Sequence, residues 1–219
     1  MNESGLKGVE EFLVELGSTA PAPGGGAAAA LTGAMAAALV EMVAGISSRR
    51  AAPQEGGLGR IRQDAEEIRT ALTKAIEEDA AAYGEVAKAL NMPKTTEEEK
   101  AARRQALARA LRRAAEVPLS TARAALRVLD LCEELIPLAS RHLQSDIAAA
   151  AQLARAATCT ALYTVDANCL WIRDQEFLTE MRPLRVKLSQ EADRKTARLL
   201  TQLEASLTSW LGERDSNPH

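Results

Sequence analysis

A run of uncharged residues from Ala20 to Val40 constrains the fold of this chain more than any other feature. Two prolines and three consecutive glycines open the run, alanine fills most of the remainder, and Glu41 follows it. Alanine is the best helix former, and its small side chain lets neighbouring backbones approach closely. A membrane span needs about 20 strongly apolar residues, and because the prolines and glycines occupy the first third of this run, the rest is too short and too weakly apolar to supply them. We therefore expect a helix from the glycines to about Ile46, packed closely against other helices.

Helical periodicity also dominates the rest of the chain, and no convincing alternating strand pattern occurs. In the third expected helix, apolar residues that include Ile76, Tyr83 and Leu90 recur at steps of three and four, as in a helix that buries one seam. The last expected helix has a seam at Leu178, Met181, Leu188, Leu199, Leu203 and Trp210. Thr96 and Glu99 have the spacing of a capping box, which predicts the start of a helix that bends near Pro118. The expected helices cover about 5–16, the glycines to 46, 57–90, 96–136, 146–171 and 174–212.

These elements predict one all-α domain over residues 1–212, a long-helix antiparallel bundle of about six helices, with 213–219 as a frayed tail. The chain of 219 residues is long enough to bury a sizeable core. The longest helices would measure about 45–50 Å at about 1.5 Å per residue. Because such helices overhang a monomer of 23.4 kDa, we expect a partner copy to cover them in a homodimer.

Charge and cysteine content limit the partners and the compartment. The formal net charge of −3 gives no overall electrostatic case for nucleic-acid binding. The first residues lack the basic start and apolar block of a secretory signal. The three cysteines form no CxxC pair, and we expect them to be small buried residues in a reducing compartment. We expect a cytoplasmic protein with no nucleic-acid or membrane partner. Two histidines leave no plausible His-rich metal site.

Gly24, Gly25 and Gly26 are the first candidate site residues. Glycines at the start of a helix leave the backbone N–H groups unobstructed at the positive end of the helix dipole. Such donors suit a carboxylate, a phosphate or the polar edge of a heterocycle. The alternative is that small residues let this helix pack closely against another, and both interpretations stay open.

Asp79 is the second candidate, because it falls on the apolar seam of the third helix between Ile76 and Tyr83. Burying an unpaired carboxylate costs several kcal/mol or raises its pKa. Either outcome makes Asp79 a candidate acid, base or ligand contact. The alternatives are an arginine partner across the bundle, or a seam that drifts and leaves the carboxylate exposed.

Other polar residues have simpler explanations. Ser145 and Asp146 suit the N-terminus of the fifth helix as a cap and a dipole partner. His142 lies in the break before them, where a histidine is usually solvated, although it can act as a general acid or base. Asp166 and Asn168 are candidate pocket-lining or satisfied core residues. The cations in breaks that can meet a polyanionic ligand tail are Arg49, Arg50 and Lys94.

Four segments together resemble the cyclodeaminase/cyclohydrolase family over about residues 5–180. They are "STAPAPGGGAAAALTGAMAAALVEMVAGIS", "EEDAAAYGEVAKALNMPKTTEEEKAARRQAL", "AAEVPLSTA" and "SDIAAAAQLARAA". The resemblance implies an all-α fold, an intimate homodimer, and a tetrahydrofolate derivative bound as substrate beside the glycines, with no tightly bound cofactor and no metal. The positions that match the family pattern are Pro23, Gly24, Gly25, Gly26, Asp79, Ser145, Asp146 and Asn168.

The chain also departs from the family pattern. The family commonly reads GNxNxxSD before the fifth helix, where this chain has Ala139, Ser140 and His142 in place of Gly, Asn and Asn. Thr164 stands where the later NVxIN segment begins with Asn. No histidine matches the one proposed as catalytic in the cyclodeaminase branch. The missing histidine, in a chain without a formiminotransferase half, favours the cyclohydrolase reaction, which opens 5,10-methenyltetrahydrofolate to 10-formyltetrahydrofolate.

The resemblance assigns hypothetical roles within that reaction. Asp79 would act as acid/base or stabilise the cationic substrate, Asp146 would hold the pterin, and His142 is a further catalytic candidate. Glycine N–H groups would bind substrate, and Arg49, Arg50 or Lys94 would face the glutamate tail. The alternatives are a formiminotetrahydrofolate cyclodeaminase, which releases ammonia, and a diverged folate-binding or scaffold protein without activity.

Overall fold

The computed structural model describes residues 3–49 and 57–215, with side chains over 8–49 and 57–206, and contains no strand in those ranges. The α-helices are α1 (Glu3–Leu16), α2 (Gly25–Ser48), α3 (Gly57–Leu90), α4 (Glu97–Leu135), α5 (Gln144–Cys169) and α6 (Gln175–Asp215), with a 3₁₀ turn at Arg141–Leu143. The prediction of an all-α fold is confirmed.

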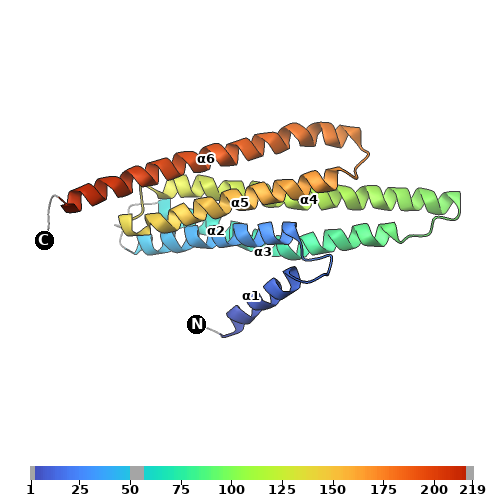
Figure 1. Cartoon of the computed structure of the whole chain (residues 1–219), viewed down its shortest axis with the longest axis horizontal. Coiled ribbons are helices and arrows are strands. Elements are labelled where there is room, and N and C mark those ends of the chain that lie inside the picture. The colour runs from blue at the N-terminus through green and yellow to red at the C-terminus, as the bar shows by residue number, and fades with distance from the viewer. Residues whose placement is uncertain (1–2, 50–56, 216–219) are drawn as a thin grey trace.

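The helices form an elongated antiparallel bundle (Figure 1). Helix α2 packs against α3, α4 and α5, while α6 lies along α4 and α5 on the other side of the bundle. The end of α3 and the start of α4 extend beyond the other helices as a hairpin, and α1 projects away from the bundle (Figure 1). Three of the described helices exceed 30 residues, with 34 in α3, 39 in α4 and 41 in α6. These lengths agree with the long helices expected from the sequence.

Small residues hold α2 close to its neighbours. A Cβ atom added at Gly33 would lie 3.0 Å from Leu72 Cδ1, 3.4 Å from Ala157 Cβ and 3.5 Å from Ala125 Cβ. Helices α2, α3, α4 and α5 therefore meet at this level with little space for a larger side chain. By length and composition α2 would also qualify as a membrane span, but half of its most apolar window is buried inside the bundle. That burial is typical of a core helix, and the absence of a membrane partner stays a prediction.

Several sequence predictions about the elements are confirmed. Thr96 caps α4: its hydroxyl accepts from the Glu99 N–H, and the Glu99 carboxylate accepts from the Thr96 N–H. Helix α4 continues through Pro118. The predicted seam of α6 is buried at Leu178, Met181, Leu188, Leu199 and Leu203, and the side chain of Trp210 lies outside the described residues.

Three predictions are wrong. The fifth helix begins at Gln144 after Leu143, so Ser145 does not cap it: the 3₁₀ turn runs directly into the helix and leaves Ser145 inside the first turn. In α3 the large residues Tyr83 and Leu90 are exposed, and Ala82 and Ala89 are buried instead, because the buried positions at this end of the helix repeat every seven residues from Ala75. The three cysteines were expected to be buried, but only Cys132 is, while Cys159 and Cys169 are half-buried.

Candidate active site

Asp79 of α3 lies at the N-terminus of α2. The backbone N–H of Ala27, in the first turn of α2, donates to Asp79 Oδ2 over 3.0 Å. Gly24 precedes the helix in an extended conformation, and no side chain caps it. The Asp79 carboxylate therefore interacts favourably with the positive end of the α2 dipole from a neighbouring helix.

Gly26 is required by this arrangement. A Cβ atom there would lie 2.0 Å from Asp79 Oδ1 and 2.7 Å from Oδ2, well inside van der Waals contact. No such restriction acts at Gly24, where a Cβ would meet nothing within 4 Å. Gly26 therefore permits the close approach of another helix, as the packing interpretation of the glycines expects, and ligand binding by their N–H groups stays a prediction.

The environment of Asp79 disfavours its charge without neutralising it. Burial is the main influence and raises the pKa of the Asp79 carboxyl, while the hydrogen bond from Ala27 lowers it by a smaller amount. Among the described residues no cation forms an ion pair with Asp79, so the alternative of a cross-bundle arginine is wrong. A half-buried carboxylate of this kind can exchange a proton or stabilise a bound cation.

Helix α5 contributes two polar residues at the same end of α2. A Cβ atom at Gly25 would lie 3.7 Å from the hydroxyl oxygen of Thr164, which places Thr164 beside the glycines. One turn later, Asn168 is half-buried, and its side-chain amide donates to the carbonyl of Ala114 over 2.7 Å. Sequence reasoning missed Thr164 as a site residue; its spacing of four residues from Asn168, which puts both on one face of a helix, was the available signal.

The structure separates the other predicted site residues from this group. Gly25 contacts Thr164, so Asp146, which lies 18 residues earlier in α5, is about 27 Å away along the bundle. Ser145 and the exposed His142 lie at that far end, as does Arg49 at the end of α2. Lys94 is exposed in the connection between α3 and α4, at the tip of the hairpin that extends beyond the start of α2. It lies 15 residues after Asp79. Arg50 lies outside the described residues.

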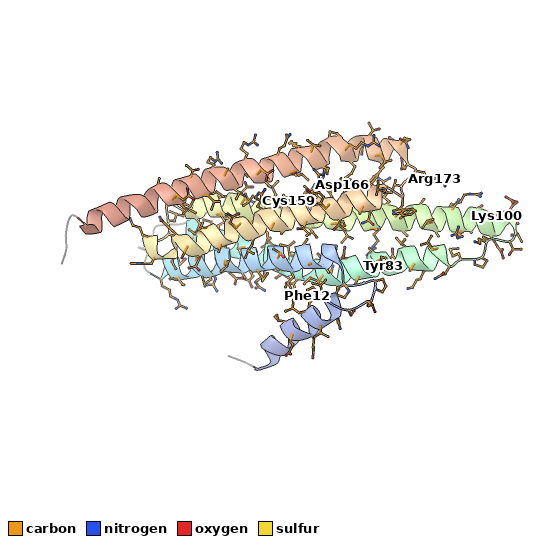
Figure 2. All side chains as sticks on the ribbon, viewed as in Figure 1. Phe12, Tyr83, Lys100, Cys159, Asp166 and Arg173 are labelled. Atoms are coloured by element: carbon orange, nitrogen blue, oxygen red, sulfur yellow. The ribbon has the colours of Figure 1, made fainter. Side chains whose placement is uncertain are left out.

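Asp166 faces α6 instead of the glycines. Its carboxylate accepts from Arg185 Nε over 2.8 Å, and Arg185 also stacks over the Tyr163 ring. Figure 2 shows Asp166 in the last turns of α5, close to the turn that carries Arg173. A cavity of about 220 Å³ between α5 and α6 is lined by Asp166, Arg182, Arg185 and less polar neighbours. No cluster of three or more metal-ligating side chains occurs among the residues the structure describes.

Known proteins share both the sequence and the fold of this chain. A family model described as formiminotransferase-cyclodeaminase matches residues 8–184. The chain is 37% identical over 179 residues to methenyltetrahydrofolate cyclohydrolase of Methylorubrum extorquens, which covers 81% of this chain and 86% of that protein. It is 32% identical over 201 residues to formimidoyltransferase-cyclodeaminase of Sus scrofa, covering 91% of this chain but 37% of the longer protein.

A solved structure agrees with these matches. The crystal structure of formiminotetrahydrofolate cyclodeaminase from Thermotoga maritima superposes with a TM-score of 0.77 at 28% identity, covering 91% of this chain and 96% of that one. The family match spans most of the helical bundle, including the glycines, Asp79, Asp146 and Asn168. This chain therefore belongs to the formiminotransferase-cyclodeaminase family.

Proposed function

We propose that this protein is a folate one-carbon enzyme that hydrolyses 5,10-methenyltetrahydrofolate to 10-formyltetrahydrofolate. The observation that carries the proposal is Asp79: a half-buried carboxylate without a cationic partner among the described residues, held at the glycine-rich start of α2. The substrate is a cation, so a partly desolvated carboxylate attracts it more strongly than the same group in water. The cyclohydrolase of Methylorubrum extorquens, at 37% identity, supports the choice of reaction.

The reaction requires a group that accepts one proton. Water adds to the methenyl carbon between the two nitrogens and loses a proton, which gives a neutral tetrahedral intermediate. The bond from that carbon to N5 then breaks, N5 takes up a proton, and the hydroxyl loses one to become the formyl carbonyl on N10. Water and the cation thus give the neutral product and one released proton. In this proposal Asp79 stabilises the cation and accepts the proton from water.

A second part of the proposal is a homodimer whose active site uses both copies. Asp79 and Asp146 lie about 27 Å apart along one chain, too far for both to contact one reacting centre. A two-fold axis perpendicular to α2 brings the glycine end of one copy to the Asp146 end of the other. The outward side of α2 supports this pairing, because Met35 and Met42 are 45% and 40% exposed there. His142, Ser145 and Arg49 of one copy would then serve the Asp79 of the other.

The cyclodeaminase reaction is the second candidate function, favoured by the Sus scrofa relative and the Thermotoga maritima structure. Both reactions pass through a tetrahedral carbon between two nitrogens, so the same carboxylate suits either. A cyclodeaminase would close 5-formiminotetrahydrofolate and release ammonia.

The deciding experiment follows the absorbance of the methenyl chromophore after the purified chain is added. We expect enzyme-dependent loss of absorbance, and we expect Asp79→Asn to remove it while the variant stays folded by circular dichroism. Ammonia release from 5-formiminotetrahydrofolate without methenyl hydrolysis would instead establish the cyclodeaminase. Calorimetric binding of folate analogues with neither reaction would establish a non-catalytic folate-binding protein, and an unchanged rate in Asp79→Asn would exclude Asp79 from the mechanism.

A further inference from the structure

Pro118 leaves one buried carbonyl of α4 without its usual hydrogen-bond donor. In an α-helix the N–H of each residue donates to the carbonyl four residues earlier, so the donor for Ala114 would be residue 118. Proline has no N–H, and both Pro118 and Ala114 are buried. Asn168 of α5 supplies the missing donor, because its side-chain amide donates to the Ala114 carbonyl over 2.7 Å.

This cross-helix bond joins α4 and α5 beside the candidate active site. Leu72, Ala125 and Ala157 all meet at Gly33. Asp79 in α3, Pro118 in α4 and Thr164 in α5 each lie seven residues, or about 10 Å, from these three residues in the direction of Gly24–Gly26. The proline therefore lies at the level of Asp79, and Asn168 secures the turn of α5 that places Thr164 against Gly25.

We infer that Asn168 is a positioning residue: its amide supplies the donor that Pro118 lacks, and so fixes the end of α5 beside Asp79. This differs from the expectation that Asn168 binds substrate, because an N–H group of its amide is used within the protein. The effect on turnover rests on the proposed function. The structural coupling between Asn168 and Pro118 does not depend on it.

A double-mutant cycle tests the coupling directly. Asn168→Ala leaves the Ala114 carbonyl buried and unpaired, and we expect the unfolding midpoint to fall by about 4–8 °C. Pro118→Ala restores an N–H in line with that carbonyl, so the same Asn168→Ala change should cost under about 2 °C in the Pro118→Ala background. Equal losses in both backgrounds would overturn the inference, whether or not the protein turns over any folate.

Activity separates positioning from a general loss of stability. Measured well below the unfolding midpoint, kcat/KM of Asn168→Ala should fall about tenfold and recover in the double variant, since the end of α5 is again held. If Asn168 bound substrate directly, Asn168→Ala would lower kcat/KM equally in both backgrounds. If Asn168 contributed only to folding stability, Asn168→Ala would leave kcat/KM unchanged. Either result overturns the positioning role.

Two single variants keep the test decisive if Pro118→Ala does not fold. Asn168→Asp keeps the size of the side chain but replaces the donor NH2 with a second acceptor oxygen, which faces the Ala114 carbonyl, so it should be at least as harmful to the unfolding midpoint as Asn168→Ala. Gln152→Ala, on an exposed position of the same helix, is the matched control and should change neither midpoint nor activity. A fully stable and active Asn168→Asp variant would refute the inference.

Discussion

Gly26 and Asp79 depend on each other, which gives a direct test of the site at the scale of single residues. In Gly26→Ala the new Cβ would overlap Asp79 Oδ1, 2.0 Å away, so the carboxylate must leave the start of α2. We expect turnover to fall at least about a hundredfold, as when a reacting group is displaced by about 1 Å.

Gly59→Ala is the matched control, because it lies in the exposed start of α3 and its Cβ would meet nothing within 4 Å. It should keep full activity and gain roughly 0.5–1 kcal/mol of stability from the better helix propensity of alanine. Full activity in Gly26→Ala would show that the position of Asp79 seen here is not the catalytic one.

The pH dependence of the protein should report Asp79. Burial raises the pKa of Asp79 in the folded chain above its pKa in the unfolded chain, with the Ala27 N–H opposing part of the shift. The ionised carboxylate therefore costs folding stability as pH rises from the unfolded pKa to the folded pKa, and in full above it. Asp79→Asn should remove this cost, so its stability relative to the parent should be greatest at neutral pH and the difference should vanish in acid.

The same pKa determines the acid side of the activity profile. If ionised Asp79 accepts the proton from water, kcat/KM falls as pH drops through the raised pKa, at a higher pH than an ordinary aspartate gives. Residual activity in Asp79→Asn should lack this decline. A decline that persists in the variant would assign it to another group.

Sequence reasoning reached Asp79 because a charged residue among seam positions of a helix is conspicuous. It could not reach Thr164 in the same way, since a threonine in a helix usually hydrogen-bonds its own backbone, as Thr164 also does with the Thr160 carbonyl. Its second property, contact with Gly25, depends on how two helices pack. The amide of Asn168 was predicted as polar and inward, but its partner, the Ala114 carbonyl, follows only from the register of α4 against α5.

At the scale of elements, local chemistry predicted the helices well and their packing less well. Thr96 with Glu99, and the glycines before α2, determine helix starts through nearby backbone groups, and the structure begins both helices there. The seam of α3 is different, because large apolar residues such as Tyr83 look like core residues by hydrophobicity alone. The buried positions there instead repeat every seven residues, at Ala75, Ala82 and Ala89, and this repeat depends on how α3 packs in the bundle.

At the scale of the whole molecule, the arrangement of the two acidic residues is the feature least accessible from one sequence. Asp79 and Asp146 both match the family pattern, yet α3 and α5 run in the same direction, with Asp79 in the second half of α3 and Asp146 in the first turn of α5, so they lie at opposite ends of the bundle. The spacing of residues in the sequence does not predict this separation, because the loops that join the helices determine the direction in which each helix runs. The proposed dimer, with one copy inverted relative to the other, would bring them together, and the exposed methionines of α2 would lie in that contact.

Mixing two inactive variants tests whether the site is shared. If each site combines Asp79 of one copy with Asp146 of the other, Asp79→Asn and Asp146→Asn homodimers are both inactive, but a mixed dimer has one intact site. Equal amounts that exchange freely form about half mixed dimers, each with one working site of two, so the activity should reach about a quarter of the parent value. The recovery should rise with time as subunits exchange, while each variant incubated alone serves as the control. If mass spectrometry shows mixed dimers and activity stays absent, the shared site is excluded, because both carboxylates would then act within the chain that carries them.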